Sequence, residues 1–293
     1  MVQSKNIAVL IAGPTASGKS KLALQMAGEL EGVIINTDSM QVYSVLNILT
    51  ARPQEEDLER AKHFLYGFLS PEFRCSTGVW LREVAKLLER DDLKNKNKIF
   101  VGGTGLYFEA LTQGFIEIPP VSEQIVDEIE RLVAPLSRQQ RMDLLQERDP
   151  EMAKVLLEPD RQRLVRALSV LAGTGRSLAN WQKDEQKGLL ASHGLKKIVL
   201  NPNREILNDR IKSRFLTMLE GGAIDEVKNI MSLDIDPSMP AMKAIGVREI
   251  SSLLAGKISR EEAIEKAVIA SRQYAKRQRT WFRRRMENWE WRS

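Results

Sequence analysis

The chain has 293 residues, of which 43% are hydrophobic and 28% charged, a balance that is typical of globular proteins and argues against disorder and fibrous repeats. One cysteine, Cys75, and two histidines, His63 and His193, exclude an internal disulfide, a structural zinc site and haem attachment. No stretch approaches the roughly 20 apolar residues that cross a bilayer. We therefore expect no membrane partner, and the cysteine usage fits a cytoplasmic location.

The formal net charge of +5 is concentrated at the C-terminal end. Residues 272–293 carry a net charge of +6, so the rest of the chain carries −1. Tyrosine, tryptophan and phenylalanine side chains stand among these charges. Such a stripe is typical of a surface that binds a polyanion, although composition alone equally allows a solvated helix.

The first part of the chain alternates between apolar and amphipathic segments. The patterns predict strands over 5–12, 33–35 and 98–101, and helices over 21–30, 79–90 and 106–111, whereas 61–68 is ambiguous. The first strand is apolar throughout, which is typical of a strand buried on both faces of a parallel sheet. This alternation predicts a doubly wound α/β fold with helices on both faces of the sheet.

From Pro119 the pattern becomes helical. Helices are predicted over 122–134, 137–146, 151–157 and 160–171, with prolines and glycines between them. A strand at 197–200, a helix at about 203–220 and a basic helix from about Ser259 then return to the first pattern. We therefore predict an α/β core formed by 1–117 and 196–293, interrupted by a helical insertion domain at 118–195.

A phosphate-binding loop stands between the first predicted strand and the first predicted helix. It matches the pattern G-x-x-x-x-G-K-[ST] with the residues Gly13, Pro14, Thr15, Ala16, Ser17, Gly18, Lys19 and Ser20. The backbone amides of such a P-loop form an anion nest at a helix N-terminus, Lys19 adds a positive charge, and the Ser20 hydroxyl is placed to bind Mg²⁺. The core is therefore predicted to be a P-loop core that binds a diphosphate or a longer phosphate chain, without deciding for a nucleotide.

Polar residues follow the next two strands. In an open α/β sheet the carboxyl ends of the strands face the ligand crevice. Asp38, after the second strand, can hold Mg²⁺ through water, accept a proton from a nucleophile, or cap the next segment. Thr104, after Gly102-Gly103, can donate a hydrogen bond to a bridging phosphate oxygen.

Two predicted helices carry basic side chains on one face. Arg210 and Arg214 are four residues apart, so both guanidinium groups can point at one anion. In the insertion, Gln162 and Arg166 share a face suited to a phosphate backbone or a base edge, and Arg163 lies beside them. Both sets also fit an ordinary solvated surface.

Together these segments resemble the family of tRNA dimethylallyltransferases, which modify adenosine 37 of bacterial tRNA. The resemblance spans almost the whole chain through GPTASGKS (13–20), DSMQVY (38–43), TARP (50–53), GGTGLY (102–107), DRQRLVRAL (160–168), TGRSL (174–178), GAIDEV (222–227), AIGVREI (244–250) and RQYAKRQRTWFR (272–283). The chain departs from the family pattern at Leu49, where a glycine is usual, and at Arg52, where a lysine is usual.

The resemblance implies that dimethylallyl diphosphate donates a prenyl group to N6 of the adenine, with Mg²⁺ as cofactor. It implies that the P-loop grips the donor diphosphate, that Asp38 is the general base, and that Thr104 and Arg214 hold the diphosphate, to which Arg210 adds its charge. It also implies contacts with the anticodon loop of tRNA, for which we expect the residues Asp38, Ser39, Met40, Gln41, Thr104, Gln162, Arg163, Leu164, Val165, Arg166, Arg277 and Arg279. We expect the enzyme to be a monomer.

Three other functions fit parts of the sequence. A small-molecule kinase would use the same P-loop with ATP as donor. In an RNA-binding regulator the P-loop would have a structural role and bind no substrate. A prenyltransferase could also use free AMP or ATP as the acceptor. The basic tail and the helical insertion favour a polynucleotide acceptor.

Overall fold

The computed structural model describes residues 7–184 and 186–293, so the predicted strand residues Lys5 and Asn6 lie outside the described part. The chain forms two compact units. One comprises residues 7–113 and 188–293, and the other comprises residues 114–187. We refer to them as the core unit and the inserted unit.

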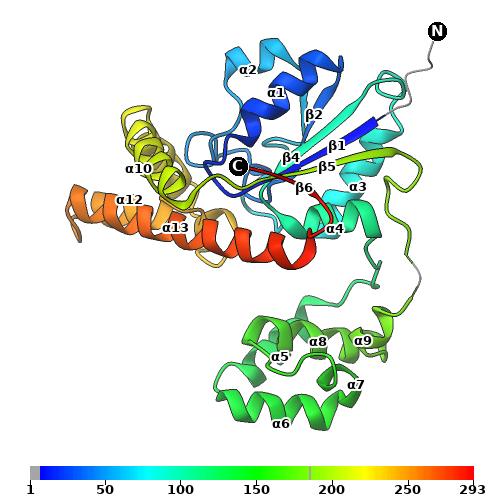
Figure 1. The fold of residues 1–293 in the computed structure, drawn as a ribbon. Helices are drawn as coiled ribbons and strands as arrows, with labels where there is room; N and C mark the ends of the chain where they lie inside the picture. Colours follow the sequence, from blue (N-terminus) through cyan, green and yellow to red (C-terminus); the bar gives the residue numbers. More distant parts are fainter. Residues whose placement is uncertain (1–6, 185) are drawn as a thin grey trace. The chain divides into compact units, whose positions relative to one another are not determined.

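The core unit is built on a parallel sheet in the order β3-β2-β4-β1-β5-β6 (Figure 1). Its strands are β1 (Ile7–Ala12), β2 (Val33–Asn36), β3 (His63–Phe64), β4 (Lys98–Gly102), β5 (Gly194–Leu200) and β6 (Glu290–Arg292). β1 lies between β4 and β5 and is buried on both faces, which explains its unbroken apolar run. The predicted parallel α/β fold is confirmed, while β3 and β6 are short edge strands that the apolar pattern does not reveal.

Helices cover both faces of this sheet, as predicted. Val9 and Ile11 of β1 pack on one face against α1 (Lys19–Glu29), next to α2 (Glu55–Arg60). Ala8 and Leu10 point to the other face, in the larger core to which the remaining helices contribute. These helices are α3 (Thr77–Leu88), α4 (Gly105–Gln113), α10 (Arg204–Glu220), α11 (Ala223–Ser232), η1 (Ala241–Lys243), α12 (Val247–Leu254) and α13 (Arg260–Arg285).

The basic helix α13 is packed into the core unit. Ser259 caps its start in a capping box with Glu262. Its buried face consists largely of small residues at helical spacing, with Ala267, Ser271 and Ala275 on one stripe and Gln278 and Phe282 continuing it. Small side chains let the helix approach its neighbours α10 and α12 closely. The basic residues thus decorate a firmly held helix.

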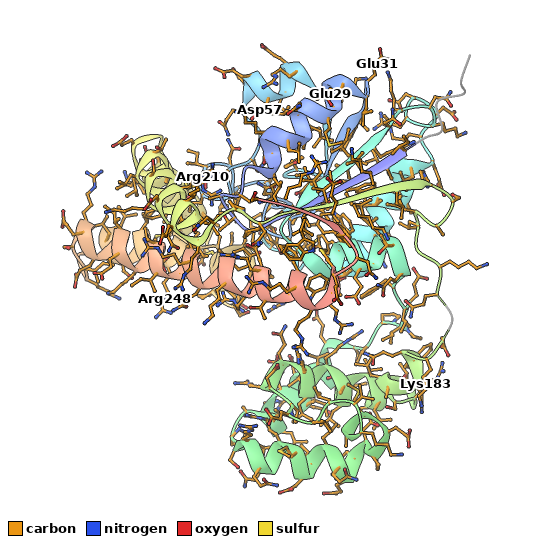
Figure 2. All side chains as sticks on the ribbon, in the orientation of Figure 1. Glu29, Glu31, Asp57, Lys183, Arg210 and Arg248 are labelled. Carbon is orange, nitrogen blue, oxygen red and sulfur yellow. The ribbon has the colours of Figure 1, made fainter. Side chains whose placement is uncertain are left out.

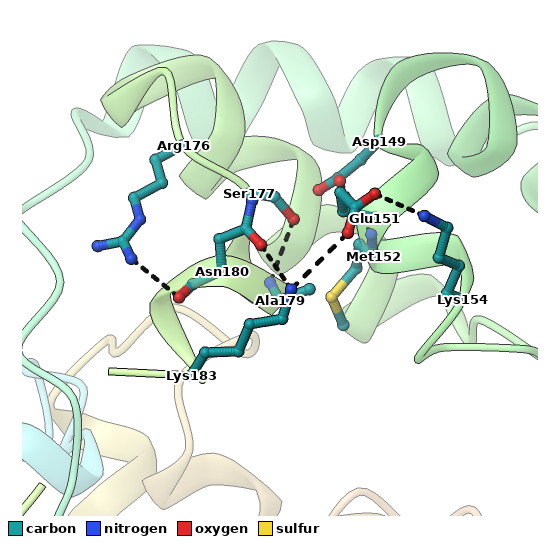
Figure 3. A network of polar contacts seen from close by, with 9 residues as sticks. All are labelled: Asp149, Glu151, Met152, Lys154, Arg176, Ser177, Ala179, Asn180 and Lys183. Carbon is teal, nitrogen blue, oxygen red and sulfur yellow. Dashed lines mark hydrogen bonds and ion pairs between the residues drawn. The ribbon is translucent and has the colours of Figure 1, made fainter. Parts of the chain in front are cut away.

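The inserted unit is a helical cluster with its own core. Its helices are α5 (Glu123–Val133), α6 (Arg138–Arg148), α7 (Pro150–Ala153), α8 (Arg161–Thr174) and α9 (Leu178–Trp181). Val133, Leu145 and Leu168 lie at the centre of its apolar cluster. Figure 3 shows the polar side of α7 and α9, where Glu151 pairs with Lys154 at 2.6 Å and with Lys183 at 3.8 Å.

The boundaries of the insertion differ from those predicted. The sequence predicts 118–195, whereas the compact unit spans 114–187. Leu190 is fully buried in the apolar core of the core unit, and its backbone amide donates to the carbonyl of Leu111 at 3.2 Å. Gly194 already pairs with Ile7 in the sheet. Residues 188–195 therefore belong to the core unit, because β5 and the segment leading into it are longer than the apolar run suggests.

Within the described part of the chain, no helix is both long enough and apolar enough to span a bilayer.

Candidate active site

The P-loop turns sharply between β1 and α1. Gly18 has φ 89° and N-caps α1, which therefore begins at Lys19, two residues earlier than predicted. Gly13 lies so close to the loop that an added Cβ would be 2.6 Å from Ser17 Oγ. This Oγ is buried and has no hydrogen-bond partner among the described residues. An unpaired buried hydroxyl in a loop of this shape is the feature expected where an anion binds.

Lys19 lies inside this loop. Its Nζ donates to the carbonyl of Pro14 at 3.3 Å. Burial lowers the pKa of Lys19 to about 8, against the opposing effect of the Asp38 carboxylate, and the nearby Arg214 cation lowers it further. A buried ammonium group with this pKa favours an incoming phosphate, because the phosphate charge restores the protonated form.

Asp38 is held by the end of β2. The fully buried Asn36 side chain accepts from the Asp38 amide at 2.9 Å and donates to the Asp38 carbonyl at 3.0 Å. Asp38 Oδ1 accepts from the Met40 amide at 2.9 Å, whereas Oδ2 receives no hydrogen bond from the described residues. The segment that follows is not a helix, so Asp38 is not a helix N-cap, but its bond to the Met40 amide does cap the turn that follows β2. One carboxylate oxygen is thus tied down and the other is available as a proton acceptor.

The turn after β4 packs tightly against this segment. A Cβ on Gly102 would lie 2.0 Å from the Thr37 carbonyl oxygen, so only glycine fits there. Thr104 Oγ1 accepts from the Ser39 amide at 2.9 Å and donates to Ser39 Oγ at 3.2 Å. The structure therefore places Thr104, which is partly exposed, beside Ser39, and its hydroxyl supports the Asp38–Met40 turn.

Two arginines of α10 reach the P-loop. The Arg214 guanidinium donates to Thr15 Oγ1, and its pKa is lowered by burial while Asp38 acts in the opposite direction. Arg210, labelled on α10 in Figure 2, is exposed, and its Nη1 lies 4.0 Å from the position of a Cβ on Gly18. The predicted pair of guanidinium groups therefore does converge on the loop.

A cavity of about 290 Å³ opens next to these groups. Its polar side contains Thr15, Asp38 and Arg214, and α13 contributes Tyr274 and Arg277. Much of the remaining lining is apolar, and it includes Leu49, which packs so closely that a Cβ on Gly246 would lie 2.5 Å from its Cδ2. The rest of the lining consists of Ser39, Met40, Thr50, Ile211, Phe215, Met218, Lys243, Ala244, Ile245 and Ser271. A cavity with an anion end and an apolar wall suits an amphipathic molecule that carries phosphate.

Of the expected tRNA contacts in the core unit, some line this cavity and others do not. Ser39, Met40 and Arg277 line it. The side-chain Nε2 of Gln41 donates to the carbonyls of Thr50 and Ala51 at 2.8 and 3.0 Å, so this side chain holds the neighbouring loop. Arg279 is not among the residues that line the cavity, and burial together with the Arg283 and Arg204 cations lowers its pKa.

In the inserted unit, Gln162, Arg163 and Arg166 are exposed on α8. Leu164 and Val165 are buried in the apolar cluster of that unit, at 0% and 7% exposure. The expectation that these two side chains contact tRNA is therefore corrected. Their apolar side chains are needed to pack α8 against its neighbours, and only the polar residues of the segment are displayed.

Few carboxylates stand near the expected metal ligand. Ser20 is exposed at the start of α1, and no group of three or more His, Cys, Asp or Glu side chains that could hold a metal occurs in the described residues. Mg²⁺ binds commonly through one or two protein oxygens together with substrate phosphates and water. The few protein oxygens present fit an ion that binds together with a diphosphate. They do not fit an ion held by protein ligands alone.

Two residues of the site escape the sequence patterns. Asn36 looks like the last residue of a strand, and Gln278 looks like one polar residue in a basic helix. Gln278 is nevertheless buried, and its Oε1 accepts from the Thr15 amide of the P-loop at 2.9 Å. The only available signal is its place within the long segment RQYAKRQRTWFR.

Comparison with known proteins decides the family. A family model described as IPP transferase matches residues 41–285, and one described as isopentenyl transferase matches residues 6–68. The chain belongs to the IPP transferase family. This transferase is 51% identical over 284 residues to the tRNA dimethylallyltransferase of Chelativorans sp. (strain BNC1), with 97% of both chains covered. It is 49% identical over 279 residues to that of Mesorhizobium japonicum, covering 95% of this chain and 87% of the relative.

Solved structures agree with this assignment. The transferase superposes with a TM-score of 0.68 at 33% identity on the full-length tRNA isopentenylpyrophosphate transferase from Bacillus halodurans, covering 98% of this chain and 90% of the other. A crystal structure of a eukaryotic dimethylallyltransferase acting on tRNA matches with a TM-score of 0.79 at 25% identity, over 95% of this chain and 70% of the other. The chain is accordingly a prenyltransferase with a P-loop core.

Proposed function

We propose that this enzyme transfers the dimethylallyl group of dimethylallyl diphosphate to N6 of adenosine 37 in tRNA and releases diphosphate. The observation that carries the proposal is the cavity lined by Asp38 and Arg214 together with apolar side chains, beside the P-loop whose Lys19 interacts electrostatically with both residues. A kinase would not need apolar side chains such as Phe215 and Met218 in the cavity next to its phosphate site. The alignment with a tRNA dimethylallyltransferase over 97% of both chains supports the same conclusion.

The chemistry follows from where charge develops. The adenine amine is a poor nucleophile because its lone pair is delocalised into the ring. As the N6–C1 bond forms and the C1–O bond of the donor breaks, positive charge builds on nitrogen, and Asp38 Oδ2 accepts the proton that N6 must lose. Assistance by a general base contributes about 10²- to 10⁴-fold in typical enzymes.

The leaving diphosphate takes the electron pair of the broken bond. Lys19, the P-loop amides, Arg214 and Arg210 surround the place where its negative charge increases. Mg²⁺, bound to the diphosphate and to Ser20, would supply further charge neutralisation. Thr104 acts in this proposal through Ser39, which it holds in the cavity wall.

The acceptor has to enter the cavity as an extruded base. Unstacking a base costs roughly a few kcal/mol, which contacts with the RNA backbone can offset. Ser39, Met40 and Arg277 stand at the cavity, and Gln162, Arg163 and Arg166 lie exposed on α8. We assign both groups to the anticodon loop, because bases in a loop can be splayed out and read by a protein.

The substrate tRNA and the single, partly buried Cys75 support a cytoplasmic location.

Labelled dimethylallyl diphosphate, Mg²⁺ and unmodified tRNA provide the direct test. Nucleoside analysis should show N6-(dimethylallyl)adenosine at position 37, and tRNA with guanosine at that position should remain unlabelled. A thermal shift with ATP and Mg²⁺ alone serves as the comparison for kinase activity. Stabilisation by ATP but not by the prenyl donor, with no labelled tRNA, would contradict the proposal.

A further inference from the structure

One buried side chain joins three parts of the active site. Gln278 lies on the packed face of α13 and is 6% exposed. Its Oε1 accepts from the Thr15 amide of the P-loop, and its Nε2 donates to the carbonyl of Gly103, both at 2.9 Å. The P-loop and the turn after β4 are therefore bridged by a residue far away in the sequence.

We propose that Gln278 is a positioning residue that sets the P-loop for the donor diphosphate. Its place on α13 is one turn after Tyr274, which lines the cavity together with Arg277. The same helix thus presents side chains to the substrate space and holds the loop that grips the donor. The identity of that donor rests on the proposed function.

Thr15 is the residue through which the bridge acts. Its backbone amide is occupied by Gln278, and its hydroxyl oxygen accepts from Arg214. Both contacts pin the front of the loop, so the amides of Ala16, Gly18 and Lys19 remain available to the anion, while the Ser17 amide donates to the Pro14 carbonyl at 3.2 Å. Without Gln278, the Thr15 amide would be left without a partner and the Thr15–Arg214 hydrogen bond would lose its support.

The site is shaped for a carboxamide. Only an amide side chain of this length supplies the acceptor and the donor that the bridge needs. Gly103 makes room for it, since an added Cβ would lie 2.1 Å from Gln278 Nε2 and 3.3 Å from Asp38 Oδ2. Glycine at this position therefore brings the bridge next to the carboxylate as well as to the P-loop.

Gln278→Met tests the proposal because methionine keeps the length and removes both hydrogen bonds. We expect the Kd of dimethylallyl diphosphate, measured by calorimetry without tRNA, to rise roughly 10- to 100-fold, as for the loss of a buried hydrogen-bond pair. The KM for the donor should rise with it, whereas the KM for tRNA stays within about twofold, since the bridge holds the P-loop and not the exposed basic residues. Gln273→Met, an exposed glutamine on the same helix, is the matched control and should bind donor normally.

A double-mutant cycle links the effect to the bridge. Gly103→Ala displaces the amide of Gln278, so Gly103→Ala and Gln278→Met should be non-additive in donor affinity. If the methionine variant fails to fold, Gln278→Glu carries the same test, because it keeps the acceptor for the Thr15 amide and loses the donor to Gly103. Unchanged donor affinity, or equal losses in donor affinity and tRNA affinity, would overturn the inference. Wild-type enzyme that does not prenylate tRNA would instead contradict the proposed function.

Discussion

Individual side chains at the cavity are held by neighbours that take no part in the chemistry. Asn36 fixes the backbone of Asp38, and Met40 occupies one of the two carboxylate oxygens. Ser39 is fixed in turn by the Thr104 hydroxyl. The carboxylate proposed as the base therefore has its free oxygen oriented before any substrate binds, which is how preorganisation lowers a barrier.

Asp38→Asn removes the proton acceptor and keeps the shape. We expect kcat to fall by about a hundredfold or more, with the Kd of tRNA little changed, because general-base assistance acts on the chemical step. Single-turnover kinetics with labelled donor measures the effect. A normal kcat in this variant would exclude Asp38 as the base.

The Lys19 ammonium predicts a pH dependence of donor binding. Its pKa is about 8 in the folded free enzyme, below the ordinary 10.5, so the protonated form that binds phosphate is lost as the pH rises through 8. Donor affinity should be nearly independent of this group below pH 8 and should fall by up to about tenfold per pH unit above it. Calorimetry across this range checks the slope, and Lys19→Ala should bind weakly with no such slope.

The same shift has a consequence for folding. Between pH 8 and 10.5 the unfolded chain holds a proton on Lys19 that the folded chain has lost, so this group adds stability as the pH rises through that window. Below pH 8 the protonated, buried lysine opposes folding. A bound diphosphate removes this cost because it pairs with the ammonium group.

Helix α11 controls the apolar wall through one carboxylate. Glu226 accepts from the backbone amides of Asn47, Ile48 and Leu49 at 2.8, 2.6 and 2.9 Å. It therefore fixes the loop that presents Leu49 and Thr50 to the cavity. This explains why an acidic residue stands in the segment GAIDEV, which lies far from the P-loop in sequence.

Glu226→Gln should loosen this loop. An amide offers one acceptor oxygen where the carboxylate offers two, so at least one backbone amide loses its partner, at about 1–3 kcal/mol of unfolding free energy. Chemical denaturation measures the loss, and the exposed Glu220→Gln on α10 should be neutral. An equally stable Glu226→Gln variant would show that the loop holds itself.

The complete site draws on both ends of the chain. The P-loop, Asp38 and Thr104 precede the inserted unit in sequence, whereas Arg214, Tyr274 and Gln278 follow it. The insertion leaves the core unit at 113 and returns at 188, where the amide of Leu190 bonds the carbonyl of Leu111. The inserted unit thus interrupts the chain without disturbing the sheet or the edge formed by the carboxyl ends of its strands.

Binding of tRNA should depend on salt through the basic helix. Arg277 stands at the cavity, while Arg279 and Arg283 lie close enough together to lower the pKa of Arg279. Changing Arg277, Arg279 and Arg283 together to glutamine should reduce the slope of log Kd against log salt by up to about 0.7–0.9 for each RNA phosphate that these arginines neutralise. Changing Lys257, just before α13, together with Arg260 and Lys266 in its first turns, is the control and should leave the slope unchanged. An unchanged slope in the first variant would mean that this end of the helix does not touch the RNA.

The sequence by itself determined the P-loop, the parallel core, the helical insertion and the placement of Asp38 at a strand end, because these follow from local patterns of glycine, apolar period and charge. Tertiary structure alone decided that Gln278 reaches Thr15, that Glu226 holds residues 47–49, and that Leu164 and Val165 face inward. Such contacts join residues far apart in the chain, or depend on which side of a helix meets a neighbour. The sequence does not tell whether a polar residue in a helix is exposed or buried, and the same holds for an apolar residue beside two arginines. Only the packing of the folded chain decides it.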